Sequence, residues 1–151
     1  APRAAGYGPV TGSFTIHVLA QPRMRVTVNW VPEPANRYML MNLVVLDSVS
    51  GSFVDGAVIS FGETHTHPVF VNTAVLNTTP IVVGTTNTMG QLPTELRIDL
   101  GTRVLTRVGD RETHRLNITV LHTGYAQRTG AIDITFSHPR AAMGAPQSRV
   151  L

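Results

Sequence analysis

The sequence contains neither cysteine nor lysine, and each absence excludes a class of site. Without cysteine the chain has no disulfide framework and no thiolate ligand for a metal ion. Without lysine it has no phosphate-binding loop of the GxxxxGKS/T type, in which the lysine contacts the phosphates. The GxSxG motif of serine hydrolases is absent as well, because the segment GSFVDG lacks its spacing.

Acidic residues are few and isolated along the chain, and this limits the chemistry further. No pair of carboxylates is placed by the sequence for glycoside hydrolysis, which needs two of them across one bond. No apolar run approaches the roughly 18 residues that a membrane helix requires. We therefore predict no enzymatic activity, no cofactor and no membrane span.

Charge is sparse and mixed in sign. The 151 residues carry 12 basic and 9 acidic side chains, for a net charge of +3. In the densest group, five arginines alternate with four acids, a pattern typical of a solvated face with salt bridges rather than of a basic stripe for nucleic acid. We therefore predict no nucleic-acid partner. The group comprises Glu95, Arg97, Asp99, Arg103, Arg107, Asp110, Arg111, Glu112 and Arg115.

Apolar and polar residues alternate along most of the chain. Alternation with period two is typical of a strand with one solvated face, and Val, Ile and Thr favour strands. The predicted strands are FTIHV, MRVTVNW, YMLMNLVVLD, AVISF, VFVNTAVL, PIVVGT, ELRIDL, TRVLTRV, RLNITVLH and AIDITFS. The apolar positions predict a core that contains Val26, Val28, Trp30, Ile98, Leu100, Ile132, Ile134 and Phe136. We interpret Met39 and Met41 as core residues rather than copper ligands, because thioethers fill irregular gaps.

The predicted strands are separated by clusters of Gly, Pro, Asn, Asp and Ser, which favour turns. No helical apolar stripe of useful length occurs. About ten short strands at this spacing predict an all-β fold, a two-sheet antiparallel β-sandwich of the jelly-roll or Greek-key type. The length predicts one domain over residues 1–151, with a core of about 12–138.

Extended arms are predicted outside this core, at residues 1–11 and 139–151. Both are built from Ala, Pro, Gly and Arg without alternation, and such segments bury too little apolar surface to fold alone. They are either loose ends or segments that become ordered against a neighbouring subunit.

The segment GETHTHPVF carries the pattern closest to a chemical site. His65 and His67 share a face if the chain is extended, and Glu63 has the same parity. The pair resembles the first motif of the cupin family in its spacing, but the carboxylate expected after it is missing, since PVFVNT contains no acid. A metal site needs three or more ligands and a supporting shell, so we interpret the pair as an ordinary feature of a wet face or interface. The remaining candidate ligands lie on separate strands or strand ends, and any one of them could approach the pair in space: His17, His114, His122 and His138.

The sequence also contains NTT at Asn77 and NIT at Asn117, which fit the glycosylation pattern and matter only in a eukaryotic secretory context.

In strand rhythm, the stretch from about Thr11 to Ser137 resembles the single jelly-roll coat or decoration proteins of icosahedral viruses. That resemblance implies a structural virion protein that assembles through strand edges and terminal arms, with itself and other shell proteins as partners. The chain differs from many RNA-virus coat proteins because it has no strongly basic arm, and this argues against genome packaging.

The alternatives are a carbohydrate-binding or adhesive module, secreted or at the cell surface, and a cupin-like metal-binding protein that uses His65 and His67. Sugar binding would need exposed aromatic rings, and besides Trp30 only three tyrosines, Tyr7, Tyr38 and Tyr125, are available.

Unprotected sheet edges also predict a homo-oligomer, because unpaired N–H and C=O groups of an edge strand bind other strands. Residues 1–12 or 138–151 are then expected to order against a partner, with His65 and His67 near such a contact.

Overall fold

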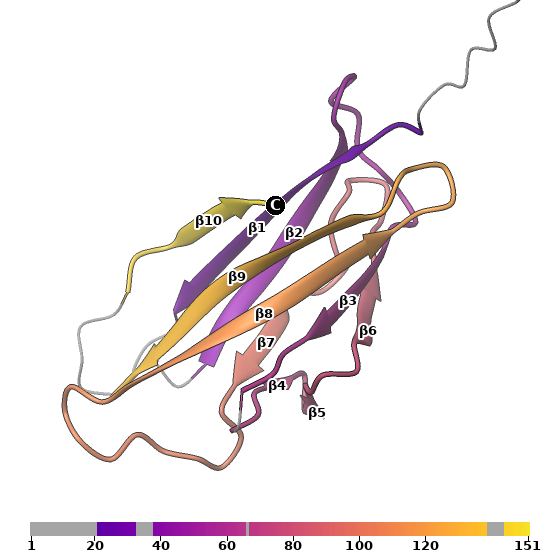
Figure 1. Ribbon diagram of the computed structural model, residues 1–151. Coiled ribbons are helices and arrows are strands. Elements are labelled where there is room, and N and C mark those ends of the chain that lie inside the picture. Colours follow the sequence, from indigo (N-terminus) through magenta and orange to yellow (C-terminus); the bar gives the residue numbers. More distant parts are fainter. Residues whose placement is uncertain (1–20, 33–37, 66, 139–143) are drawn as a thin grey trace, which may run out of the picture.

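The computed structural model describes residues 21–32, 38–65, 67–138 and 144–151. Over these residues the chain forms ten β-strands in two antiparallel sheets that pack face to face (Figure 1). The prediction of an antiparallel β-sandwich is confirmed. None of the described segments is a helix of the length and hydrophobicity needed to cross a bilayer. The predicted strand FTIHV, the arm at residues 1–11 and His17 lie outside the described residues.

The larger sheet has six strands in the order β10-β1-β2-β7-β4-β5, and the smaller sheet has four in the order β6-β3-β8-β9. The strands of the larger sheet are β1 (Met24–Pro32), β2 (Tyr38–Asp47), β4 (Phe70–Val71), β5 (Ala74–Val75), β7 (Leu96–Asp99) and β10 (Gln147–Val150). Those of the smaller sheet are β3 (Val58–Gly62), β6 (Ile81–Thr85), β8 (Arg111–Leu121) and β9 (Arg128–Ser137).

The connections between the sheets follow a Greek-key pattern. β2 pairs with β7 in one sheet, while their successors β3 and β8 pair in the other. The order β1-β2-β7-β4 opposite β3-β8-β9 corresponds to the ABED and CFG strands of immunoglobulin-type sandwiches, with β5, β6 and β10 as additional strands. This order matches the Greek-key alternative of the predicted fold. The strand order defines the architecture of the fold, but it does not assign a function to the protein.

The core lies between the sheets and follows the alternation of the sequence. In β1 every second residue from Met24 to Trp30 is buried, and β8 and β9 show the same period. All eight core residues predicted from the apolar parity are buried, with Trp30 the most exposed of them at 8%. Met39 and Met41 are also buried, so the prediction of a packing role is confirmed for both.

Two predicted strands differ from the structure. TRVLTRV forms turns and loop, with Val104 and Val108 each 70% exposed, so its alternation does not reflect burial against a sheet. VFVNTAVL is divided into β4 and β5 by a two-residue turn in which Asn72 and Thr73 both have positive φ. A hairpin turn of two residues with positive φ matches the twist of the strands, which explains the break.

The C-terminal residues extend the larger sheet of the same chain. Residues 139–151 were predicted to form an arm, but β10 pairs with β1 over four residues. The Leu151 N–H donates to the Val26 carbonyl at 2.8 Å, and the Leu151 side chain packs against Gly130 of β9. This contact joins the β10 edge of the larger sheet to β9 at the edge of the smaller sheet. The edge strands β5 and β6 lie on the opposite side (Figure 1).

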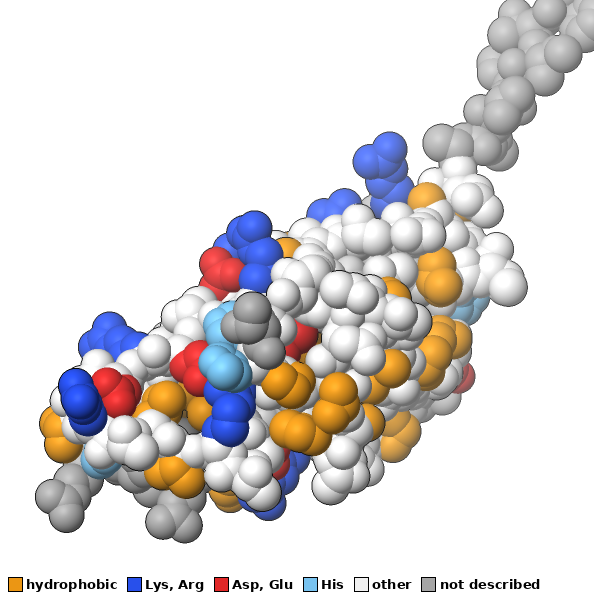
Figure 2. Space-filling view, turned by 60° about the horizontal axis from the view of Figure 1, so that its bottom comes forward, with side chains coloured by type: hydrophobic (Ala, Val, Ile, Leu, Met, Phe, Trp, Pro, Cys, Tyr) orange, Lys and Arg blue, Asp and Glu red, His pale blue; other side chains and the backbone are white. Residues whose placement is uncertain are grey.

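The end of the molecule that contains β4 and β5 carries both apolar and charged side chains (Figure 2). Histidine side chains reach the surface there between acidic and basic groups, and apolar side chains gather beside them. At this end, histidine, acidic and basic side chains therefore lie next to an exposed apolar area.

Candidate functional site

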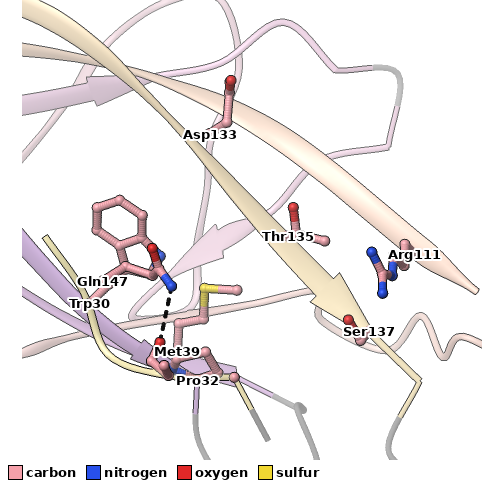
Figure 3. Close-up of a pocket in the computed structure, with 10 residues that line it drawn as sticks. Trp30, Pro32, Met39, Arg111, Asp133, Thr135, Ser137 and Gln147 are labelled. Atoms are coloured by element: carbon pink, nitrogen blue, oxygen red, sulfur yellow. Dashed lines mark hydrogen bonds between the residues drawn. The ribbon is translucent and has the colours of Figure 1, made fainter. Parts of the chain in front are cut away.

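A groove of about 390 Å³ lies between β9 and the segments β1 and β10 (Figure 3). Trp30 and Met39 line its apolar side, and Thr135 and Ser137 line its polar side. Its acidic group, Asp133, is engaged in an exposed ion pair with Arg115 at 3.3 Å. The groove therefore offers an apolar wall and hydroxyl groups, without an acid–base pair aimed into it.

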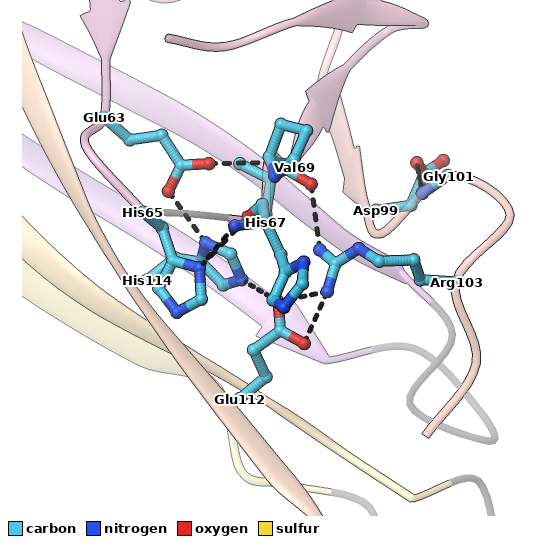
Figure 4. Close-up of polar contacts among 10 residues, drawn as sticks. Glu63, His65, His67, Val69, Asp99, Gly101, Arg103, Glu112 and His114 are labelled. Carbon is cyan, nitrogen blue, oxygen red and sulfur yellow. Dashed lines mark hydrogen bonds and ion pairs between the residues drawn. The ribbon is translucent and has the colours of Figure 1, made fainter. Parts of the chain in front are cut away.

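A cluster of ionisable side chains lies outside this groove, around the side chain of His114 on β8 (Figure 4). This ring is fully buried, and both of its nitrogens face carboxylates. Nδ1 lies 2.7 Å from Oε2 of Glu63, and Nε2 lies 2.6 Å from Oε1 of Glu112. Only the doubly protonated imidazolium has a donor for each of these two acceptors.

Glu63 enters the site from the end of β3. The strand ends at Gly62, where an added Cβ would lie 3.3 Å from the carbonyl oxygen of Asn77, and the Glu63 N–H donates to that same oxygen. The Glu63 side chain is 1% exposed, and its Oε1 accepts the N–H of Val69 at 2.7 Å. Glu63 thus joins His114 to the far end of the loop at residues 63–69.

Glu112 has a second partner in Arg103, from the loop after β7. Nη1 of Arg103 lies 2.5 and 2.6 Å from the two oxygens of Glu112, and Nη2 donates to the carbonyl of Pro68 at 2.9 Å. Burial raises the pKa of Glu112, but hydrogen bonds from Arg103 and His114 and their positive charges outweigh it, so the pKa lies below its ordinary value. Glu112 is therefore held as a carboxylate.

The four groups form one network, in which two acidic side chains face a guanidinium and an imidazole ring, and the charges balance when that ring is doubly protonated. Buried charges are tolerated only when they are paired and hydrogen-bonded, and this arrangement meets both conditions. Its members come from three separate places: the β3 end, the β7–β8 loop and β8 itself. The network thus fixes two loops to the smaller sheet.

His65 and His67 lie on the solvent side of this network. The His65 ring packs on the ring of His114, with centroids 4.2 Å apart and planes at 40°. Its Nδ1 lies 3.0 Å from the backbone N of His67 and 3.1 Å from the carbonyl of the same residue. Both histidines are exposed, so His65 covers His114 and still faces water.

The structure regroups the residues that the sequence singled out. Glu63, His65 and His67 do not share a strand face, because β3 ends at Gly62 and Glu63 turns inward while the histidines are exposed. The described residues whose potential ligand atoms come together, all within 4.8 Å of one another, are His65, Glu112 and His114.

Glu112 was not identified as a site residue, and His114 was named only as one of four further histidines that could approach the pair, although the sequence contains a signal for both. Both have the same parity on β8 as Leu116 and Ile118, which are buried. A titratable side chain on the apolar parity of a strand needs polar partners inside the protein. The register of β3 and β8, with Gly62 opposite Asn117, brings the loop after β3 to this part of β8.

A shallow pocket of about 290 Å³ lies next to the network and is lined in part by Glu63, His65, Asn77 and Thr78. Fold and site together define a β-sandwich with one buried ionic cluster near its surface. Comparison of the chain with protein-family models, with curated proteins and with solved structures gave no match.

Proposed function

We propose that this protein is a structural subunit that associates with further copies of itself through the outer edge of β6. The observation that carries this proposal is that β6 is an edge strand without charge. No described strand pairs with its outer side, and its sequence, IVVGT, contains no charged residue. Val82, in the second position of the strand, is 64% exposed.

An edge strand of this kind binds other strands because its outer N–H and C=O groups lack partners within the sheet. Proteins that remain monomeric commonly protect such edges with charged residues or proline, and β6 has neither between Ile81 and Thr85. Its register with β3 shifts, since Ile59 pairs with Gly84 and Ser60 with Val82, which leaves Val83 as a bulge. A bulge bends the edge and restricts the geometry of pairing, which favours a defined assembly over open-ended aggregation.

The surface on the same side of the sandwich as β6 also favours association with a second copy of the chain. Val75 of β5, on the same side of the sandwich, is 43% exposed, and apolar side chains group at this end of the molecule (Figure 2). Two copies related by a twofold axis can pair β6 with β6 in antiparallel orientation, which is self-complementary and needs no opposite charges. A second copy of this chain is therefore the partner that fits this edge.

In its finer form the proposal is a shell or decoration subunit of an icosahedral virion, in contact with itself and with other shell proteins. This form is motivated by the resemblance in strand rhythm to jelly-roll coat proteins, although the strand order is that of the Greek-key alternative. A subunit that associates by its edges suits it. The carbohydrate-binding alternative is less well supported by the described tyrosines. The guanidinium of Arg97 lies 4.2 Å from the ring centroid of Tyr38, and the hydroxyl of Tyr125 donates to Asp47.

The test is sedimentation of the full chain over a range of concentrations, together with two matched variants. Val82→Arg places a charge on the β6 edge, whereas Val49→Arg places the same charge on a turn residue that is 93% exposed. We expect the wild type and Val49→Arg to associate with increasing concentration and Val82→Arg to remain monomeric. A wild type that is monomeric at every concentration, or a Val82→Arg variant that associates equally well, would overturn the proposal.

A further inference from the structure

We propose that His65, His114 and Glu112 form a binding site for a divalent transition-metal ion, with Zn²⁺ as the reference ion. This inference is independent of the assembly proposed above. One potential ligand atom from each residue lies within 4.8 Å of the other two. Two imidazole nitrogens and one carboxylate oxygen are a ligand set that binds Zn²⁺ and leaves a further position for water or another group.

The partners of His114 match those of a histidine that binds a metal. Such a histidine donates its other ring N–H to a carboxylate or a carbonyl, which fixes the ring and makes it a better ligand. Here Nδ1 lies 2.7 Å from Glu63, whose other oxygen is held by the Val69 N–H. Nε2 is thereby directed at Glu112, on the side of the site that His65 covers.

His65 is held by the backbone of His67. Its Nδ1 accepts the His67 N–H at 3.0 Å and lies 3.1 Å from the carbonyl oxygen of the same residue. Because a nitrogen that accepts this N–H carries no proton, the neutral ring has its proton on Nε2 in this geometry. To bind the ion through Nε2, the ring has to carry its proton on Nδ1, which then donates to the His67 carbonyl in place of the bond from the N–H.

The geometry requires a small adjustment of Glu112. Two ligand atoms on a tetrahedral Zn²⁺ lie about 3.3 Å apart, given metal–ligand bonds of about 2.0–2.1 Å. The present distance between His114 Nε2 and Glu112 Oε1 is 2.6 Å, that of a hydrogen bond, so the ion takes the place of the bridging proton and separates the two atoms by about 0.7 Å. Oε1 of Glu112 exchanges its 2.5 Å contact with Nη1 of Arg103 for the metal, while Oε2 can remain on Nη1, 2.6 Å away.

Isothermal titration with Zn²⁺, on full-length protein stripped with chelator, tests the site. We expect one ion per chain, released again by chelator. His65→Ala is the main variant, because its exposed side chain can be removed without opening the core, and it is expected to weaken binding at least tenfold. Glu63→Gln keeps all three ligands and should weaken binding by about 10–100-fold through the loss of the carboxylate partner.

The control is His122→Ala, which removes a half-buried histidine on the loop between β8 and β9 and should leave the affinity unchanged. Visible absorption of bound Co²⁺ provides a second readout, in which His65→Ala should alter the spectrum and His122→Ala should not. Repeating the titration on Val82→Arg separates metal binding from assembly. Absence of stoichiometric binding by the wild type, or equal weakening by His65→Ala and His122→Ala, would overturn the proposal.

Discussion

Replacing His114 by phenylalanine should cost several kcal/mol, and a second substitution at Glu63 should recover part of that loss. Phenylalanine keeps a ring of similar size beside Phe136, which lies 6.0 Å from the His114 ring in an edge-on arrangement. It removes both donors, however. Glu112 still has Arg103, but the Oε2 atom of Glu63 loses its partner in a place where that side chain is 1% exposed.

The magnitude follows from the cost of an unpaired buried charge. Breaking a buried ion pair by removing one partner typically costs about 3–5 kcal/mol, and we expect His114→Phe to fall in that range. In the wild type, Glu63→Gln should also destabilise, by about 1.5–3 kcal/mol, because it weakens a hydrogen bond to a charged group. In the His114→Phe background the same substitution removes the unpaired charge, so it should stabilise. The sign of its effect therefore reverses between the two backgrounds.

Urea unfolding at neutral pH with chelator present measures these effects. Trp30 is the only tryptophan and is 8% exposed, so its fluorescence reports the opening of the core. With a urea m-value of about 2 kcal/mol/M, a loss of about 3–5 kcal/mol lowers the midpoint by roughly 1.5–2.5 M. If Glu63→Gln destabilises both backgrounds by the same amount, Glu63 and His114 are not coupled and the description of the network is incorrect.

Three further predictions concern the scaffold. Gly90 and Gly51 both have positive φ, but a Cβ at Gly90 would lie 2.5 Å from a backbone carbonyl oxygen, whereas Gly51 has open space around it. Gly51→Ala should cost about 1–2 kcal/mol and Gly90→Ala a further 1–3 kcal/mol in thermal unfolding, and equal costs would contradict this geometry. Backbone N–H groups and the hydroxyl of Tyr125 hold the pKa of Asp47 below its ordinary value of 3.8, so its contribution to stability is complete above that pH and is lost as the pH falls through the lowered pKa. Asp47→Asn should therefore flatten the loss of thermal stability below about pH 4, and an unchanged acid dependence would rule out this role. Phe136→Ala should cost about 3–5 kcal/mol in urea unfolding, since the ring is 1% exposed, and a cost below 1 kcal/mol would place it outside the core.

The fold could be predicted from the sequence because one physical signal, alternation with period two, dominates it. Wherever that alternation was accompanied by a partner strand, as in β1, β8 and β9, the parity identified the buried face. The signal was misleading at TRVLTRV, whose alternation lies in a loop. It was also insufficient for residues 147–150, which have no apolar alternation and form β10 mainly through backbone hydrogen bonds with β1. The amino-acid composition of residues 147–150 does not predict this pairing, because the pairing depends on where β1 lies in the fold.

The site was only partly predictable, for a related reason. The pair His65 and His67 is visible in the sequence, and so is the nearby Glu63, but their geometry depends on where β3 ends. His114 is 51 residues from Glu63, and only the pairing of β3 with β8 brings them together. Arg103 and Glu112 were assigned to a solvated face from their mixed charges. That interpretation is supported for Arg97, which is exposed and pairs with the half-buried Asp99, whereas the Arg103–Glu112 pair is partly buried and belongs to the network.

The network also bears on why a chain with few charged residues buries several of them in one place. A buried ion pair is often no more stabilising than apolar side chains of the same volume, so stability alone does not explain its presence. The double variant His114→Phe with Glu63→Gln addresses this, because it leaves no unpaired buried charge. If that variant is nearly as stable as the wild type, the ionic groups serve something other than folding, and metal binding by His65, Glu112 and His114 becomes the better explanation. If the double variant remains several kcal/mol less stable, the network instead acts by fixing the loop at residues 63–69 to β8, and the ligand arrangement around His114 follows from that structural role.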